Sequence, residues 1–203
     1  MVATNDTALW RRVWSLKDHG KSWDAVYGRT HPPGFRWLHD SIGSNFRGTE
    51  IQAAIGRIQY RRLNDWRAER TGNARIMTDL LSGIAGLRIP TPGPSLTHAY
   101  YRLYGYVDVT ALADGWTRDR VLLGANARQP LPIVSGSCSE IYREAAFRGT
   151  ESIPPAPLPH AHAMSASSVA FHVHPGLTPD DLAAAAGALA AALDEAMSTE
   201  YRS

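Results

Sequence analysis

The sequence predicts an α/β protein, because segments with strand patterns and segments with helix patterns alternate after Pro94. Residues 100–109 and 169–173 alternate in the way that half-buried strands do, with Tyr and Val well represented. Thr117 and Thr178 each precede a helical pattern and can cap it through the side-chain hydroxyl. This alternation indicates an α/β or α+β domain.

The other elements follow from caps, breakers and periodicity. In the first half of the chain we expect the end of a strand over 1–4, a helix over 5–16 with an apolar stripe, and a long aromatic loop over 21–40. A helix is then expected from Thr49 to about Leu81, with an irregularity near Asn64 or Gly72. In the second half we expect a strand over 129–134, a helix from the 135–140 turn through Phe147, and a short helix ending near Ser165. Residues 83–94 are rich in breakers and predict a boundary between domains 1–85 and 86–203.

Composition places the chain among globular proteins. Its 203 residues are 44% hydrophobic, with a net charge of +2. Cys138 is the single cysteine, so no intrachain disulfide can form, and a reducing cytoplasm fits. The first residues do not resemble a signal peptide, and no apolar run is long enough for a membrane span. We therefore expect a cytoplasmic protein without a membrane partner.

Arginines are concentrated in one helical segment. Six of them lie between residues 57 and 75, at 57, 61, 62, 67, 70 and 75. Such a group can form a nucleic-acid patch or a solvated or interface face. Because Asp65, Glu69 and Asp79 dilute the charge and no aromatic platform accompanies it, the second interpretation is favoured and no nucleic-acid partner is expected.

The loop over 41–48 leads into the long helix. Thr49 and Gln52 have the spacing of a capping box, so the helix begins near Thr49. Asn45 and Arg47 then lie just before a helix N-terminus, where free backbone amides and the helix dipole favour an anion. The residues fit a phosphate or carboxylate site, but by themselves they favour an ordinary loop-to-helix junction.

Two further groups of residues could carry chemistry. His160, His162, His172 and His174 could bind zinc, but no cysteine or carboxylate is interleaved at ligand spacing, so packing or surface pairs are favoured and no metal is expected. Cys138 lies in a Gly-Ser-Cys-Ser turn and could be a nucleophile, although a lone loop cysteine is the more ordinary interpretation.

Several motifs together resemble the DegT/DnrJ/EryC1/StrS aminotransferases. They occur in the family's order: Val2-Ala3-Thr4-Asn5-Asp6, Leu16-Lys17-Asp18-His19-Gly20, Gly43 through Gly56, His98-Ala99-Tyr100-Tyr101, Gly136 through Tyr142, and His174-Pro175-Gly176-Leu177-Thr178. The resemblance implies the C-terminal part of a fold-type-I enzyme that depends on pyridoxal 5′-phosphate (PLP), with the end of the large domain over 1–85 and the small domain over 86–203.

The resemblance also implies a function. Such enzymes are dimers that move an amino group from glutamate or glutamine to a keto group, commonly on a nucleotide-linked sugar, in polysaccharide or secondary-metabolite biosynthesis. Asn45 matches the asparagine that reaches the PLP phosphate of the neighbouring subunit. Arg47 is expected near phosphate, substrate or interface, and His19 at the rim of the active site.

The family's catalytic lysine, which forms the Schiff base with PLP, matches no residue here and is expected upstream of Met1. Lys17 and Lys21 come after the Val-Ala-Thr-Asn-Asp match, and the residues that pair with and stack on the PLP ring are also missing. We therefore expect the isolated chain to be inactive. The alternative is a non-catalytic remnant or split-enzyme subunit that pairs with a full-length aminotransferase.

Overall fold

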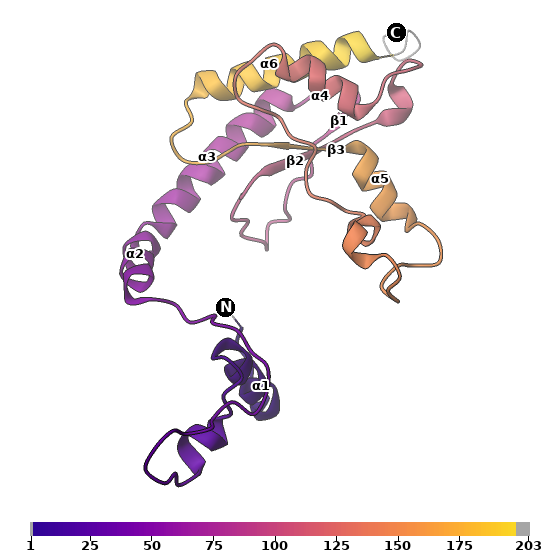
Figure 1. The fold of residues 1–203 in the computed structure, drawn as a ribbon. Coiled ribbons are helices and arrows are strands. Elements are labelled where there is room, and N and C mark those ends of the chain that lie inside the picture. Colours follow the sequence, from indigo (N-terminus) through magenta and orange to yellow (C-terminus); the bar gives the residue numbers. More distant parts are fainter. Residues whose placement is uncertain (1, 198–203) are drawn as a thin grey trace. The chain divides into compact units, whose positions relative to one another are not determined.

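A computed structural model describes residues 2–197. The chain divides into two compact units, Met1–Arg61 and Arg62–Ser203, and each is described by itself. The elements carry the labels of Figure 1.

The first unit contains helices α1 (Thr7–Lys17) and α2 (Glu50–Arg61), with a short π-helix over Asp24–Gly28 between them. The Asp6 carboxylate caps α1 by accepting hydrogen bonds from the amides of Ala8 (2.8 Å) and Leu9 (3.1 Å). Neither α1 nor α2 has a buried residue, so the apolar stripe expected on the first helix is present in sequence but contacts no core. Among the described residues of this unit, only Gly20 and Ala25 are buried.

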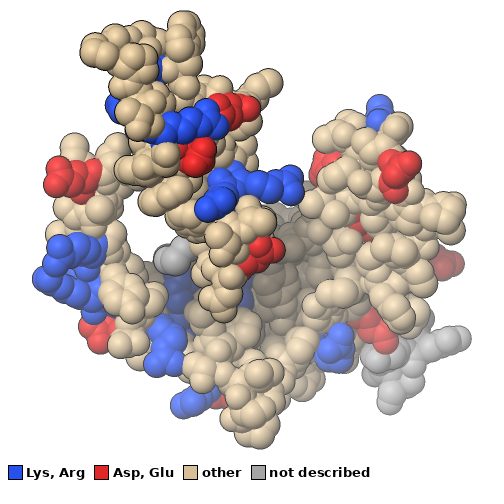
Figure 2. Space-filling model, turned by 90° about the horizontal axis from the view of Figure 1, so that it is seen from below, with Lys and Arg blue, Asp and Glu red and all other residues tan. Residues whose placement is uncertain are grey.

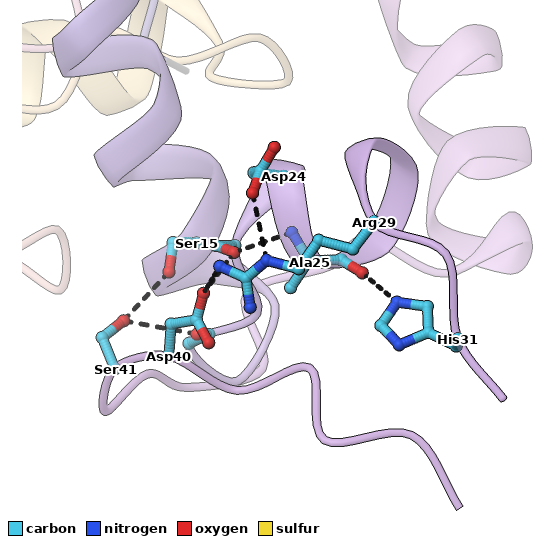
Figure 3. A network of polar contacts seen from close by, with 9 residues as sticks. Ser15, Asp24, Ala25, Arg29, His31, Asp40 and Ser41 are labelled. Atoms are coloured by element: carbon cyan, nitrogen blue, oxygen red, sulfur yellow. Dashed lines mark hydrogen bonds and ion pairs between the residues drawn. The ribbon is translucent and has the colours of Figure 1, made fainter. Parts of the chain in front are cut away.

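Polar contacts hold the aromatic loop of the first unit (Figure 3). The Arg29 guanidinium donates to Asp24 and to Asp40, each at 3.1 Å, and His31 Nε2 donates to the Ala25 carbonyl at 2.6 Å. Four aromatic side chains add a cluster with ring centroids 4.3–6.2 Å apart: Trp10, Trp14, Trp23 and Tyr27. The loop is therefore ordered by hydrogen bonds and ring contacts, with little buried surface.

The second unit is a three-stranded antiparallel sheet with helices packed against it (Figure 1). Its strands are β1 (Leu87–Arg88), β2 (Leu103–Val107) and β3 (Ser168–Phe171), in that spatial order, with Leu103 opposite Phe171. Its helices are α3 (Leu63–Leu81), α4 (Arg118–Asn126), α5 (Pro159–Ser167) and α6 (Pro179–Ala196), and short 3-10 turns cover Val109–Ala111, Ile141–Arg143 and Ala145–Phe147.

Burial alternates along β2, and Leu103, Gly105 and Val107 face the core. Helices α3, α4 and α6 supply the other side of this core, with Met77, Val121 and Leu189 fully buried. The sheet face and the three helices thus form one apolar layer, as the alternating pattern predicts.

The helix caps are confirmed. The Thr178 hydroxyl accepts from the Asp181 amide while the Asp181 carboxylate accepts from the Thr178 amide, and Thr117 caps α4. The Thr49–Gln52 box is present as well, with bonds of 2.8 and 3.3 Å.

The helix from Thr49 ends at Leu81 as predicted, and the irregularity expected near Asn64 or Gly72 is a break at Arg62, between α2 and α3. Three other predicted elements were wrong. Residues 2–4 form no strand, and Met1 lies outside the described residues. The strand over 129–134 is reduced to a single bridge between Val134 and Ala170. Two 3-10 turns replace the helix through Phe147, because side chains ahead of it bond to distant segments: Ser137 to the Tyr104 hydroxyl and Ser139 to the Ala161 carbonyl.

Helix α3 packs against α6 within the second unit. The division between the two compact units falls between Arg61 and Arg62 in the sequence. The predicted boundary at residues 85–86 refers to the two domains of a whole aminotransferase, and it stays a prediction.

Arg118 joins three segments of the second unit. This side chain is buried, and its guanidinium donates to the carbonyls of Ser135 (3.0 Å), Ser165 (2.8 Å) and Ser168. It also pairs with Asp119 at 2.7 Å. One guanidinium thus fastens the loop before Gly136, the end of α5 and the start of β3.

We expect Arg118→Ala to lower the stability of the second unit by about 2–3 kcal/mol, since it leaves several carbonyls without a charged donor. Urea unfolding followed by circular dichroism measures the change. The control is Arg148→Ala, which removes an exposed guanidinium. Equal stabilities of the two variants would contradict the assigned role.

Candidate anion site at the Asp-His-Gly turn

The turn after α1 lies against the loop before α2. The His19 amide donates to the Ser44 carbonyl at 3.1 Å, and the Phe46 amide donates to the Lys17 carbonyl at 2.9 Å. A further bridge pairs Asp18 with Asn45. Residues that are 25 to 29 positions apart in sequence are therefore joined by backbone hydrogen bonds.

Two glycines permit this close approach. A Cβ on Gly20 would lie 1.7 Å from the Ser41 carbonyl oxygen, and one on Gly43 would lie 2.2 Å from the Gly20 nitrogen. Gly20 also has φ of +81°, a conformation that favours glycine. His19 itself has φ of +58°, which is uncommon for a residue with a side chain. This strained turn orients the His19 and Asp18 side chains.

Asp18 connects the polar side chains of the site. Its Oδ1 lies 3.2 Å from His19 Nδ1, 3.4 Å from Lys21 Nζ and 3.4 Å from Arg47 Nη1. The His19 hydrogen bond, with smaller contributions from Lys21 and Arg47, holds the Asp18 pKa below its ordinary value against the opposing effect of burial. One carboxylate therefore fixes three nitrogen-bearing side chains.

The predicted site residues His19, Asn45 and Arg47 come together around this carboxylate. Asn45 Oδ1 accepts from Arg47 Nε at 3.0 Å, which fixes the orientation of the carboxamide and leaves its NH2 as a donor. Both side chains are exposed. The sequence did not single out Asp18 or Lys21 for the site, although both flank the Asp-His-Gly motif.

The donor set fits a phosphate. An amide NH2 and a guanidinium, both exposed and oriented by neighbours, are donors that suit phosphate oxygens. The residues thus match the chemistry of the PLP phosphate. The Lys21 ammonium also belongs to this network, 3.4 Å from Asp18 Oδ1.

The other candidate groups lie elsewhere. The rings of His172 and His174 are 5.9 Å apart, and burial, Arg102 and His174 lower the pKa of His172. His162 contacts Glu140 at 3.3 Å, and His160 and Cys138 are exposed. The described part of the chain brings together no set of three or more His, Cys, Asp or Glu side chains placed to hold a metal.

Charge is distributed without one dominant patch on the face that Figure 2 shows, where blue and red side chains are interspersed among tan ones. Among the described helices, none combines the length and apolarity needed to cross a bilayer.

The model of the DegT/DnrJ/EryC1/StrS aminotransferase family matches residues 1–190. The chain belongs to this family, and the predicted α/β fold of a PLP-dependent aminotransferase is confirmed. An aminotransferase from Psychrobacter cryohalolentis has a solved structure with 42% identity and a TM-score of 0.79, covering 96% of this chain and 51% of that one.

Two curated relatives are more distant. The erythromycin biosynthesis sensory transduction protein EryC1 of Saccharopolyspora erythraea is 30% identical over 49% of this chain and 24% of its own. The dTDP-3-amino-3,4,6-trideoxy-alpha-D-glucose transaminase of Streptomyces venezuelae is 28% identical over 46% of this chain and 21% of its own. The matched parts cover about a quarter of the length of these two curated relatives, and this chain covers about half of the chain in the Psychrobacter structure.

A match with a different name is a tRNA dimethylallyltransferase of Nitrobacter hamburgensis, 40% identical over 44% of this chain and 30% of that protein. It covers less than half of the chain, whereas the family model extends over residues 1–190. The assignment to the aminotransferase family therefore follows from the longer match.

The lowered pKa of Asp18 predicts the pH dependence of the first unit. A carboxyl group with a depressed folded-state pKa stabilises the fold above its unfolded pKa, and that stability is lost as the pH falls through the folded value. We expect His19→Ala and Arg47→Gln each to raise the Asp18 pKa, as measured by carboxyl-carbon NMR titration. Glu50→Gln is the control. An Asp18 pKa that stays low in both variants would contradict the network.

Proposed function

We propose that this chain supplies the phosphate-binding loop of a PLP-dependent aminotransferase that acts on nucleotide-linked keto sugars. The observation that carries this proposal is the oriented Asn45 amide beside Arg47 and Asp18, ahead of α2. The family supports an aminotransferase, and the name of the Streptomyces venezuelae relative supports a dTDP-linked sugar substrate.

In this proposal Asn45 donates from its amide to a PLP phosphate oxygen of a neighbouring subunit, and Arg47 binds phosphate or substrate. Asp18 orients Arg47 and His19, and His19 lies at the rim of the substrate site. When bound, PLP supplies the electron sink for transfer of the amino group from glutamate or glutamine. The lysine that holds PLP in the family matches neither Lys17 nor Lys21, so this chain needs another polypeptide segment for activity.

The test is complementation. We expect the 203-residue chain alone to give no turnover of a dTDP-linked keto sugar with glutamate, and co-expression with the unmatched half of the Psychrobacter enzyme to restore it. Asn45→Ala should then lower PLP affinity by about tenfold or more, since a hydrogen bond to a charged group contributes about 1.5–3 kcal/mol.

Asn64→Ala, which removes an exposed amide from α3, is the matched control. Turnover by the chain alone would refute the need for another segment. PLP binding that Asn45→Ala and Asn64→Ala affect equally would refute the role of Asn45.

A second candidate function is that of a non-catalytic subunit that pairs with a full-length aminotransferase. The observation that favours it is the apolar face of α2, where Ile51, Ile55 and Ile58 recur at helical spacing and are 73%, 54% and 52% exposed. A helix face of this kind is suited to a protein interface.

We expect this chain to co-purify with a full-length relative from the same cells, and Ile55→Glu to abolish co-purification. Leu123→Glu, on an exposed position of α4, should leave it intact. Absence of co-purification by the unaltered chain would count against pairing.

A further inference from the structure

A cavity of about 580 Å³ lies in the second unit, among the 3-10 turns over Ile141–Arg143 and Ala145–Phe147, the loop that follows them, and α5 (orange in Figure 1). Its volume is within the range of cavities that hold small organic ligands. None of the residues around Asp18 lines it, so it is a different place from the candidate anion site.

A buried carboxylate holds the frame of this cavity. The Glu140 side chain is only 6% exposed, and it accepts from the Tyr142 hydroxyl (2.8 Å), Arg143 Nη1 (3.2 Å) and His162 Nδ1 (3.3 Å). The Tyr142 hydroxyl in turn accepts from the Leu158 amide at 3.2 Å, at the start of α5. The Tyr142 hydrogen bond, with smaller contributions from His162 and Arg143, holds the Glu140 pKa below its ordinary value against the opposing effect of burial. Glu140 is therefore ionised and committed to the protein's own donors.

Two further charged side chains line the cavity, and they are not paired. Glu144 and Arg148 stand immediately before and after the turn Ala145–Phe147, and both are exposed. Within residues 2–197, neither side chain takes part in an ion pair or a hydrogen bond. One carboxylate and one guanidinium thus face the same cavity, and each has its bonding capacity left for a ligand.

The remaining wall is apolar and stiff. It is formed by Ile153, Pro154, Pro155, Ala156 and Pro157. Proline has no backbone N–H and a fixed φ, so this wall offers few donors and little freedom to rearrange. It therefore suits the apolar part of a ligand.

The charges of the lining select the class of ligand. A ligand with only a carboxylate would leave Glu144 facing a second negative charge, and one with only an ammonium would leave Arg148 without a complement. The Glu140 charge attracts neither, because Arg143 already pairs with it at 3.2 Å. A molecule that carries both charges satisfies both groups, and the proline wall requires that the rest of it be apolar.

We propose that this cavity binds a small zwitterion with an apolar body, an apolar α-amino acid or a short apolar peptide, whose carboxylate pairs with Arg148 and whose ammonium pairs with Glu144. The apolar side chain lies against the wall of Ile153 and the prolines. This ligand differs from the glutamate or glutamine donor of the proposed function, because a polar side chain would meet the apolar wall.

The test is isothermal titration calorimetry of the 203-residue chain with L-phenylalanine and with the dipeptide Phe-Leu. It uses neither PLP nor a second polypeptide, so its result is independent of the complementation test. We expect at least one of the two to bind, and the tighter one identifies the source of the ligand. Hydrocinnamate lacks the ammonium and phenethylamine lacks the carboxylate, so each should bind about tenfold more weakly or worse than L-phenylalanine, as expected for the loss of one charged hydrogen bond.

Single substitutions separate the two charges. Glu144→Gln should weaken L-phenylalanine and phenethylamine but leave hydrocinnamate unchanged, whereas Arg148→Gln should weaken L-phenylalanine and hydrocinnamate but leave phenethylamine unchanged. Glu151→Gln and Arg75→Gln are the matched controls, since both residues are exposed and neither lines the cavity. Circular dichroism melting establishes that each variant is folded.

Three results would overturn the proposal. The first is absence of binding by both L-phenylalanine and the dipeptide. The second is binding of hydrocinnamate, phenethylamine or L-glutamate as tight as that of L-phenylalanine. The third is binding of L-phenylalanine that Glu144→Gln and Arg148→Gln weaken no more than their matched controls do.

Discussion

The first unit depends on the close backbone approach between Gly20 and the loop from Ser41 to Asn45. A methyl group on Gly20 or Gly43 would overlap the opposite backbone. Because only Gly20 and Ala25 are buried among the described residues of this unit, no apolar core can compensate for a loss of these contacts. The position of every side chain around Asp18, including Asn45 and Arg47, follows from two residues that have no side chain.

The second unit, in contrast to the first, is stabilised by an apolar core. Its sheet and three helices enclose a continuous apolar cluster, and its polar side chains fasten loops to that core. Arg118 does so at three carbonyls. Arg70 does the same for the loop at Tyr100, whose φ of +45° is a strained conformation that the surrounding packing offsets. The difference explains why the candidate anion site of the first unit is polar and exposed, whereas the second unit encloses an apolar core.

Local chemistry was predictable from the sequence, and distant contacts were not. The capping boxes at Thr49 and Thr178 involve residues three apart, and both are present. Asn45, Arg47 and His19 were identified from a motif, but their common partner Asp18 requires knowing that two segments pair. The helix expected through Phe147 failed for the same reason, since Ser137 and Ser139 bond to residues more than 20 positions away.

Helices α1 and α2 of the first unit both leave apolar side chains exposed. On α2 the isoleucines that give the helix its amphipathic pattern contact no core, and α1 likewise has no buried residue. Amphipathic helices gain most of their stability from packing of the apolar face. Helices whose apolar faces are open gain stability when another surface covers them. The open face of α2 is the surface that the proposed pairing would cover, and Asn45 lies five residues before the first residue of that helix.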